Sequence, residues 1–210
     1  MNKKPILIVC GEPNSIFSEI ITKSFRESNS KKPILLIGSF DLLKSQLKKL
    51  NIKSKLNLVK LNKYLFKALD RKRINILDVN YKFKKPFETI SSKSNKYIKK
   101  CFDISFQIIN SNEISGLING PISKRFFLGK NYQGVTEYIA KKYNLKQNFA
   151  MLIYNKNFSV SPLTTHIAVK NISNKISKKK LIENIILIKK FYKTYFNDNA
   201  KLAVTGLNPH

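Results

Sequence analysis

The chain has 210 residues, of which 42% are hydrophobic and 11% aromatic, so it can bury a real core, and a disordered tail is excluded. Lysine and arginine outnumber the acids 40 to 12, giving a formal charge of +28. The basic pairs are scattered along the chain and form no stripe interleaved with aromatics, so we expect no nucleic-acid partner, whereas small phosphorylated ligands are favoured.

Apolar runs and amphipathic segments alternate through the first half of the chain. The strands are expected at 5–10, 33–38, 56–61 and 74–79, and the helices at 15–27, 41–50 and 91–111. Asn14 or Ser15 is expected to cap the first helix. This alternation is typical of an α/β fold with a mostly parallel sheet, whose ligands gather at the carboxyl ends of the strands. The rule places Gly11-Glu12-Pro13 at the rim of a site.

The second half begins with a short apolar segment, 116–119, that ends in the turn Gly120-Pro121. Two interpretations of this turn stay open: a plain tight turn, or backbone N–H groups offered to an anion. Thr136 is expected either to cap the helix that follows it or to offer its hydroxyl to a phosphate. Further strands are expected at 149–154, 158–160, 163–169 and 201–207, and helices at 137–143 and 178–197. We expect a first α/β domain over 1–118 and part of a second over 119–210.

The cysteine count and the hydropathy indicate a soluble cytoplasmic protein. Cys10 and Cys101 do not make a disulfide framework and are interpreted as buried free thiols in a reducing compartment. The apolar stretch near the N-terminus is too short for a signal peptide. Because no run reaches about 18 apolar residues, no membrane span is expected.

The two histidines of the chain, His166 and His210, each lie in or just after an apolar run that resembles a strand. Neutral imidazole is a common ligand of zinc and similar divalent ions, so the pair indicates a metal site. A catalytic metal site uses three protein ligands and one open position. The third ligand must therefore be an acid, a residue of another chain, or a residue outside this sequence.

Five motifs occur in one order along the whole chain. They are Gly11-Glu12-Pro13, Leu117 to Pro121 with Lys124, Gly134 to Glu137, Thr164-Thr165-His166 and Gly206 to His210. In this order they resemble the 4-hydroxythreonine-4-phosphate dehydrogenase family of pyridoxal phosphate biosynthesis, and the two histidine motifs are the specific part. The resemblance implies an isocitrate/isopropylmalate-dehydrogenase-like two-domain fold, a homodimer, NAD as cofactor, and a divalent metal such as zinc, magnesium or cobalt.

The resemblance also implies roles for individual residues. His166 and His210 match metal ligands, and Thr136 matches a substrate-binding threonine. Val135 stands in the substrate-binding position where the family usually has histidine. No catalytic group and no NAD-contacting residue is assigned in this chain. The implied reaction oxidises 4-phosphohydroxy-L-threonine to 2-amino-3-oxo-4-phosphooxybutanoate, which decarboxylates to 3-amino-2-oxopropyl phosphate.

Two alternatives stay open beside that reaction. Val135 changes the phosphate or carboxylate contacts, which leaves room for a dehydrogenase of a phosphorylated four-carbon sugar acid. The sequence also stops within the second histidine motif, whereas the family continues into a part with a third histidine and most of the NAD site. The chain is therefore expected to be a fragment or a non-catalytic truncated remnant that binds metal weakly and shows no turnover by itself.

Overall fold

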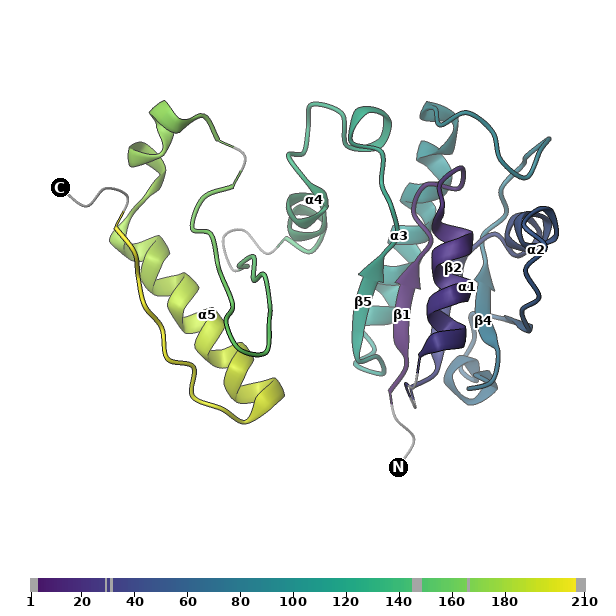
Figure 1. Ribbon diagram of the computed structural model, residues 1–210, viewed down its shortest axis with the longest axis horizontal. Coiled ribbons are helices and arrows are strands. Elements are labelled where there is room, and N and C mark those ends of the chain that lie inside the picture. Colours follow the sequence, from purple (N-terminus) through teal and green to yellow (C-terminus); the bar gives the residue numbers. More distant parts are fainter. Residues whose placement is uncertain (1–3, 29, 31, 145–148, 166, 207–210) are drawn as a thin grey trace. The chain divides into compact units, whose positions relative to one another are not determined.

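The computed structural model describes residues 4–28, 30, 32–144, 149–165 and 167–206 (Figure 1). The chain divides into two compact units, Met1–Asn131 and Tyr132–His210. The domain boundary expected after residue 118 thus falls inside a strand of the first unit's sheet, Gly116–Asn119.

The first unit is built on a five-stranded sheet in which every pairing is parallel. Its strands are β1 (Ile6–Val9), β2 (Ile34–Gly38), β3 (Leu56–Val59), β4 (Ile74–Asp78) and β5 (Gly116–Asn119), in the order β3-β4-β2-β1-β5. The predicted α/β fold with a parallel sheet is confirmed. The continuous apolar runs form strands here because both faces of each central strand are covered.

Helices cover both faces of this sheet, with α1 in front of it and α3 behind it in Figure 1. The helices of the unit are α1 (Phe17–Glu27), α2 (Phe40–Lys49) and α3 (Asn95–Ile109), with shorter helical turns η1 (Leu65–Ala68), η2 (Ser92–Ser94) and η3 (Lys124–Leu128). Alternate strand residues serve the two faces: Ile8 and Leu36 pack with Phe17 of α1, whereas their neighbours Leu7 and Leu35 belong to the opposite face. The core is thus a three-layer α/β/α arrangement.

The first helix begins differently from the prediction. Its N-cap is Ile16, which makes no side-chain capping bond, so neither Asn14 nor Ser15 is the cap. Ser15 Oγ still accepts from the backbone N–H of Phe17 at 3.3 Å. The Asn14 side chain instead accepts from the N–H of Glu88 at 3.0 Å, which ties the loop after β1 to a distant segment.

The described residues of the second unit form two α-helices, α4 (Val135–Lys142) and α5 (Lys178–Phe196), and the short turns η4 (Val169–Asn171) and η5 (Ser173–Lys175). The strands predicted at 149–154, 158–160, 163–169 and 201–207 are wrong for the described residues, where one antiparallel bridge, Ile153 to Val160, is the whole of the pairing. A strand needs a neighbour for its N–H and C=O groups, and apart from that bridge these segments find none among the described residues. Apolar sequence alone could not reveal that.

The two cysteines are free, as expected. Cys101 is also buried as expected, whereas Cys10 is only half-buried. Over the described part of the chain, no helix combines the length and apolarity needed to cross a membrane.

Candidate functional site

The loops after β1 and β5 touch at the carboxyl edge of the first unit's sheet. Gly11 has a φ of +74°, and a Cβ there would lie 2.3 Å from the carbonyl oxygen of Pro121. The backbone N–H of Glu12 donates to that same oxygen at 2.7 Å, and the N–H of Gly120 donates to Val9 O at 2.7 Å. The N–H groups of Glu12 and Gly120 are therefore used within the protein, and Pro121 has no N–H to offer to an anion.

Glu12 is a buried carboxylate, with 2% of its surface exposed. Its Oε2 accepts from the hydroxyl of Ser94 at 2.7 Å, just before α3, and its Oε1 accepts from the N–H of Asn14 at 3.2 Å. Hydrogen bonds to a charged acceptor are about twice as strong as neutral ones, so the carboxylate joins the β1 loop firmly to the start of α3.

Gln46 completes the contacts at this edge. Its Nε2 donates to the carbonyl oxygens of Pro13 at 2.7 Å and Pro86 at 2.8 Å, and its side chain is buried. The site rim expected at Gly11-Glu12-Pro13 is therefore occupied by side chains that bind one another. In this unit the motif holds loops together, which is a structural role.

The thiols and phenol beneath this edge are held in their neutral forms. Burial raises the pKa of Cys101 to about 12 and that of Tyr97 well above its ordinary value. Tyr97 Oη accepts from the backbone N–H of Ser39 at 2.8 Å. Because a thiol must ionise to act as a nucleophile, Cys101 has a packing role.

The start of α4 carries the predicted substrate residues. Val135 is the first residue of the helix and is half-buried, and Thr136 is the second and is exposed. The N-cap is Gly134, with no side-chain capping bond, so the prediction that Thr136 caps this helix is wrong. Gly134 has extended backbone, and the helix begins directly after it, two residues earlier than expected. A Cβ on Gly134 would lie 2.9 Å from Glu137 Oε2.

Glu137 links two of the sequence motifs. Its Oε1 accepts a hydrogen bond from Thr165 Oγ1 at 3.3 Å, and both side chains are half-buried. The bond joins the first turn of α4 to the residue before position 166. In the sequence, Glu137 is predicted as the start of a helix and as the last residue of the motif Gly134 to Glu137. The separation of 28 residues gives no signal that it would meet Thr165.

His166 and His210 both lie outside the described residues, so the predicted imidazole pair stays a prediction. Within 4–144, 149–165 and 167–206, apart from positions 29 and 31, no three His, Cys, Asp or Glu side chains gather closely enough to hold a metal ion. The residues present do suit a divalent metal in one respect. Glu137 supplies a carboxylate that accepts from the chain neighbour of position 166, and an outer carboxylate of this kind commonly orients the segment that carries a metal ligand.

Comparison with known proteins gives a consistent family. The family model described as "Pyridoxal phosphate biosynthetic protein PdxA" matches residues 29–210. A 4-hydroxythreonine-4-phosphate dehydrogenase of Aquifex aeolicus is 30% identical over 212 residues, covering 100% of this chain and 64% of the relative. A Clostridium botulinum protein named "Putative D-threonate 4-phosphate dehydrogenase" is 26% identical, also covering 100% and 64%. The chain thus spans less than two thirds of the length of these relatives.

Solved structures agree on the fold. The structure of 4-hydroxythreonine-4-phosphate dehydrogenase from Klebsiella pneumoniae matches 91% of this chain with a TM-score of 0.73 at 23% identity, and 60% of that chain is covered. A Burkholderia phymatum structure with the same enzyme name gives a TM-score of 0.74 at 18% identity, covering 92% of this chain and 58% of that one. At such identities the likeness establishes the α/β fold.

Proposed function

The chain belongs to the pyridoxal phosphate biosynthetic protein PdxA family, and on that premise we propose that it serves as an NAD- and divalent-metal-dependent dehydrogenase of 4-phosphohydroxy-L-threonine. The product would be 2-amino-3-oxo-4-phosphooxybutanoate, which decarboxylates to 3-amino-2-oxopropyl phosphate. The role would lie in the synthesis of pyridoxal 5'-phosphate.

The observation that carries the proposal is the hydrogen bond between Glu137 and Thr165. It brings the motif of the substrate residues next to the motif of the first metal histidine. Thr136 is exposed in the first turn of α4, where the unpaired N–H groups and the positive end of the helix favour an anion. We assign the Thr136 hydroxyl to bind the phosphate or carboxylate of the substrate. Val135 makes an apolar contact with the same side of the substrate.

His166 and His210 are the residues proposed to hold the metal, and Glu137 orients the chain beside His166 through Thr165. The metal, when bound, supplies a Lewis acid that lowers the pKa of the substrate's secondary alcohol, whose carbon gives its hydride to NAD. The residues of this chain fix where that alcohol lies. No NAD-contacting residue is assigned within the chain.

A second candidate substrate is a phosphorylated four-carbon sugar acid. Val135 favours it because valine cannot donate a hydrogen bond or carry a proton, so contacts to the substrate's polar end must differ from those made by histidine. The Clostridium botulinum relative carries a name with such a substrate. Both candidates share the phosphate and the secondary alcohol, so the same residues would serve either one.

A homodimer and a cytoplasmic location belong to the same proposal. Large apolar side chains of the second unit are open to solvent within the chain, among them Phe158 at 76% and Tyr195 at 67%, which supports a covering partner surface. The free thiols Cys10 and Cys101 suit a reducing compartment. Sedimentation that gave only monomers at micromolar concentration would contradict the dimer.

The substrate is decided by steady-state kinetics on protein expressed from its complete reading frame. We expect metal-dependent NADH formation with kcat/KM at least about tenfold higher for 4-phosphohydroxy-L-threonine than for D-threonate 4-phosphate. The reverse ratio would favour the second candidate. Val135→His is the matched variant, and it should raise the preference for the hydroxythreonine substrate if Val135 tunes selectivity.

A further inference from the structure

A hollow with a strongly basic lining lies at the opposite, amino-terminal edge of the first unit's sheet. It has a volume of about 200 Å³ and is formed by the last turns of α1, the loop before β3 and the turn before β4. Five of its nine lining residues are cations: Lys23, Arg26, Lys53, Lys55 and Lys72. Basic residues make up 40 of 210 in the whole chain, so this concentration exceeds the general positive charge.

Most of these cations have no carboxylate to compensate them. Lys23 pairs with Glu19 at 2.6 Å, one turn back on α1. In the part of the chain that the structure describes, no ion pair involves Arg26, Lys53, Lys55 or Lys72. Like charges around one hollow repel one another and give it a positive potential, and a multivalent anion relieves that repulsion.

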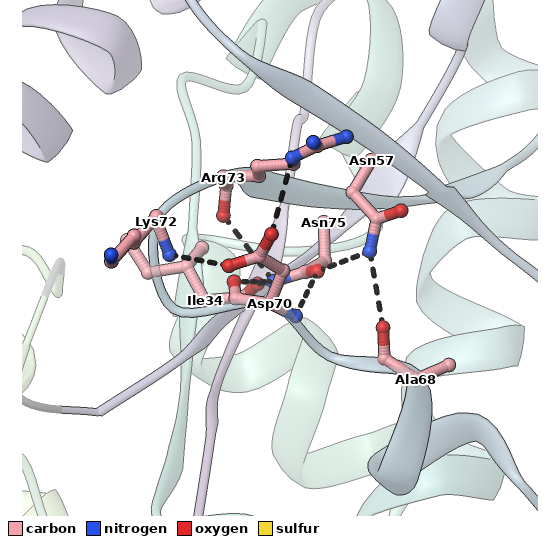
Figure 2. Close-up of polar contacts among 7 residues, drawn as sticks. All are labelled: Ile34, Asn57, Ala68, Asp70, Lys72, Arg73 and Asn75. Atoms are coloured by element: carbon pink, nitrogen blue, oxygen red, sulfur yellow. Dashed lines mark hydrogen bonds and ion pairs between the residues drawn. The ribbon is translucent and has the colours of Figure 1, made fainter.

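A buried polar network holds the turn that carries Lys72 (Figure 2). Asn75 of β4 is fully buried, and its Oδ1 accepts from the backbone N–H of Asp70 at 2.7 Å and from Asn57 Nδ2 at 2.8 Å. Asp70 Oδ1 in turn accepts from the backbone N–H of Lys72 at 2.8 Å. The backbone of Lys72 therefore has a fixed position.

The other cations also stand on fixed backbone. Lys55 O accepts from the N–H of Ile74 at 2.9 Å, where β3 and β4 begin to pair. Ile52 N donates to Leu47 O at 3.0 Å, which anchors the loop to the end of α2. Phe25 and Ile52 give the hollow half-buried apolar walls, and Ser54 adds a hydroxyl. Five basic side chains, all exposed, thus line one hollow from backbone positions that are fixed.

We propose that this hollow is a binding site for a small multivalent anion that carries two or more phosphate groups. The hollow has a volume of about 200 Å³, far above the roughly 10–15 Å³ that one water needs, so several waters, or a diphosphate in their place, can enter it. The site lies at the sheet edge opposite Gly11 and Gly120 and uses none of the residues proposed for the dehydrogenase reaction. Anion binding in the hollow and the dehydrogenase reaction can therefore be tested separately.

Calorimetric titration of the full chain with inorganic pyrophosphate, in buffer of about 0.15 M ionic strength, tests this proposal. The double variant Lys53→Gln/Lys72→Gln removes two lining charges. The matched control, Lys60→Gln/Lys96→Gln, removes two charges from exposed lysines of the same unit outside the hollow. Urea midpoints of both variants should equal that of the wild type, because all four side chains are exposed.

We expect saturable binding of one pyrophosphate per chain, about tenfold weaker in the hollow variant and within about twofold in the control. Equal weakening in both variants would show that net charge alone attracts the anion, and would overturn the proposal. So would binding that fails to saturate. A single-stranded RNA that bound more tightly than pyrophosphate and lost the same factor in the hollow variant would overturn it in favour of a nucleic-acid surface.

Discussion

Thr165 Oγ1 donates a hydrogen bond to Glu137 Oε1 at 3.3 Å and so connects two segments separated by 28 residues. One segment begins α4 with Val135 and Thr136, and the other leads directly into position 166. If the PdxA family chemistry operates here, this bond keeps the substrate residues and the metal histidine in register. It is therefore the contact whose loss should matter most to the site.

The affinity of the full chain for Co²⁺ tests the hydrogen bond between Glu137 and Thr165. We expect Glu137→Gln to weaken Co²⁺ binding about tenfold, since loss of an outer orienting group commonly costs this much in metal affinity. Thr165→Val should weaken it similarly, whereas Thr165→Ser, which keeps the hydroxyl, should restore it. The control Asp198→Asn removes an exposed carboxylate of the same unit and should have no effect. Equal affinities for Thr165→Val and Thr165→Ser would contradict the orienting role.

The buried carboxylate of Glu12 should contribute to stability. Glu12→Gln replaces the two carboxylate oxygens that accept from Ser94 and Asn14 by one amide oxygen and an N–H₂ group, so only one of the two bonds can be kept. We expect a loss of about 2 kcal/mol in the free energy of unfolding. Glu19→Gln, which breaks only an exposed pair with Lys23, should cost less than about 0.5 kcal/mol. Urea titrations give the free energy of unfolding of both variants. Equal losses would show that the buried bonds of Glu12 stabilise the protein no more than the exposed Glu19–Lys23 pair.

Asn75 should be the least replaceable polar residue of the sheet. Its Nδ2 donates to carbonyl oxygens of Ile34 and Asp70, both at 2.8 Å, while its Oδ1 accepts two further bonds. Asn75→Ala leaves these buried groups unpaired, and we expect a loss of about 3 kcal/mol by urea titration. Asn57→Ala should cost about half as much, since Asn57 is only half-buried. An Asn75→Asp protein as stable as the wild type would refute the network, because its carboxylate would face those carbonyls.

Gly11 should tolerate no side chain. Its φ of +74° disfavours any L residue, and a Cβ would meet Pro121 O at 2.3 Å, a backbone atom that cannot move alone. We expect Gly11→Ala to lower the free energy of unfolding by at least about 2 kcal/mol. Gly116→Ala is the control, because nothing lies within 4 Å of a Cβ there. Its stability should stay within about 0.5 kcal/mol of the wild type. The thermal midpoints of the two variants should therefore separate clearly.

The buried thiol of Cys101 should make stability fall in alkali. Its pKa is raised to about 12 by burial, so the folded state keeps the proton that the unfolded thiol loses above about pH 8.5. The stabilisation is full below pH 8.5 and is lost as the pH rises toward the folded pKa. At pH 10 this group alone should cost about 2 kcal/mol relative to pH 7. The urea midpoint of Cys101→Ala should decline less between pH 7 and pH 10 than that of the wild type. Equal declines would contradict the raised pKa of Cys101.

The first unit could be predicted well because its strands are covered on both faces and their apolar runs are unbroken. Ile6–Val9 and Ile34–Gly38 are strands since each also has parallel neighbours to pair with. Segment 201–206 has a shorter apolar stretch, Leu202-Ala203-Val204, and no partner among the described residues, so it forms no strand. Local composition predicts the tendency, whereas pairing depends on tertiary structure.

The site could be predicted only in part, for the same reason. Val135 and Thr136 are the first two residues of α4, whereas the sequence predicts that helix only from residue 137, with Thr136 as a possible cap. The contact of Glu137 with Thr165 depends on how distant segments fold back, and nothing in their spacing announces it. Glu12 was placed at a site rim by a general rule for parallel sheets, but its carboxylate is taken up by Ser94 and Asn14.

The rate of metal-dependent NAD reduction with 4-phosphohydroxy-L-threonine, in protein from the complete reading frame, tests the proposed function most directly. We expect turnover that stops when the metal is chelated and returns with zinc, magnesium or cobalt, and that falls by at least about a thousandfold in His166→Ala. A His166→Ala protein with the wild-type rate, or a wild-type protein with no metal-dependent rate on either phosphorylated substrate, would contradict it.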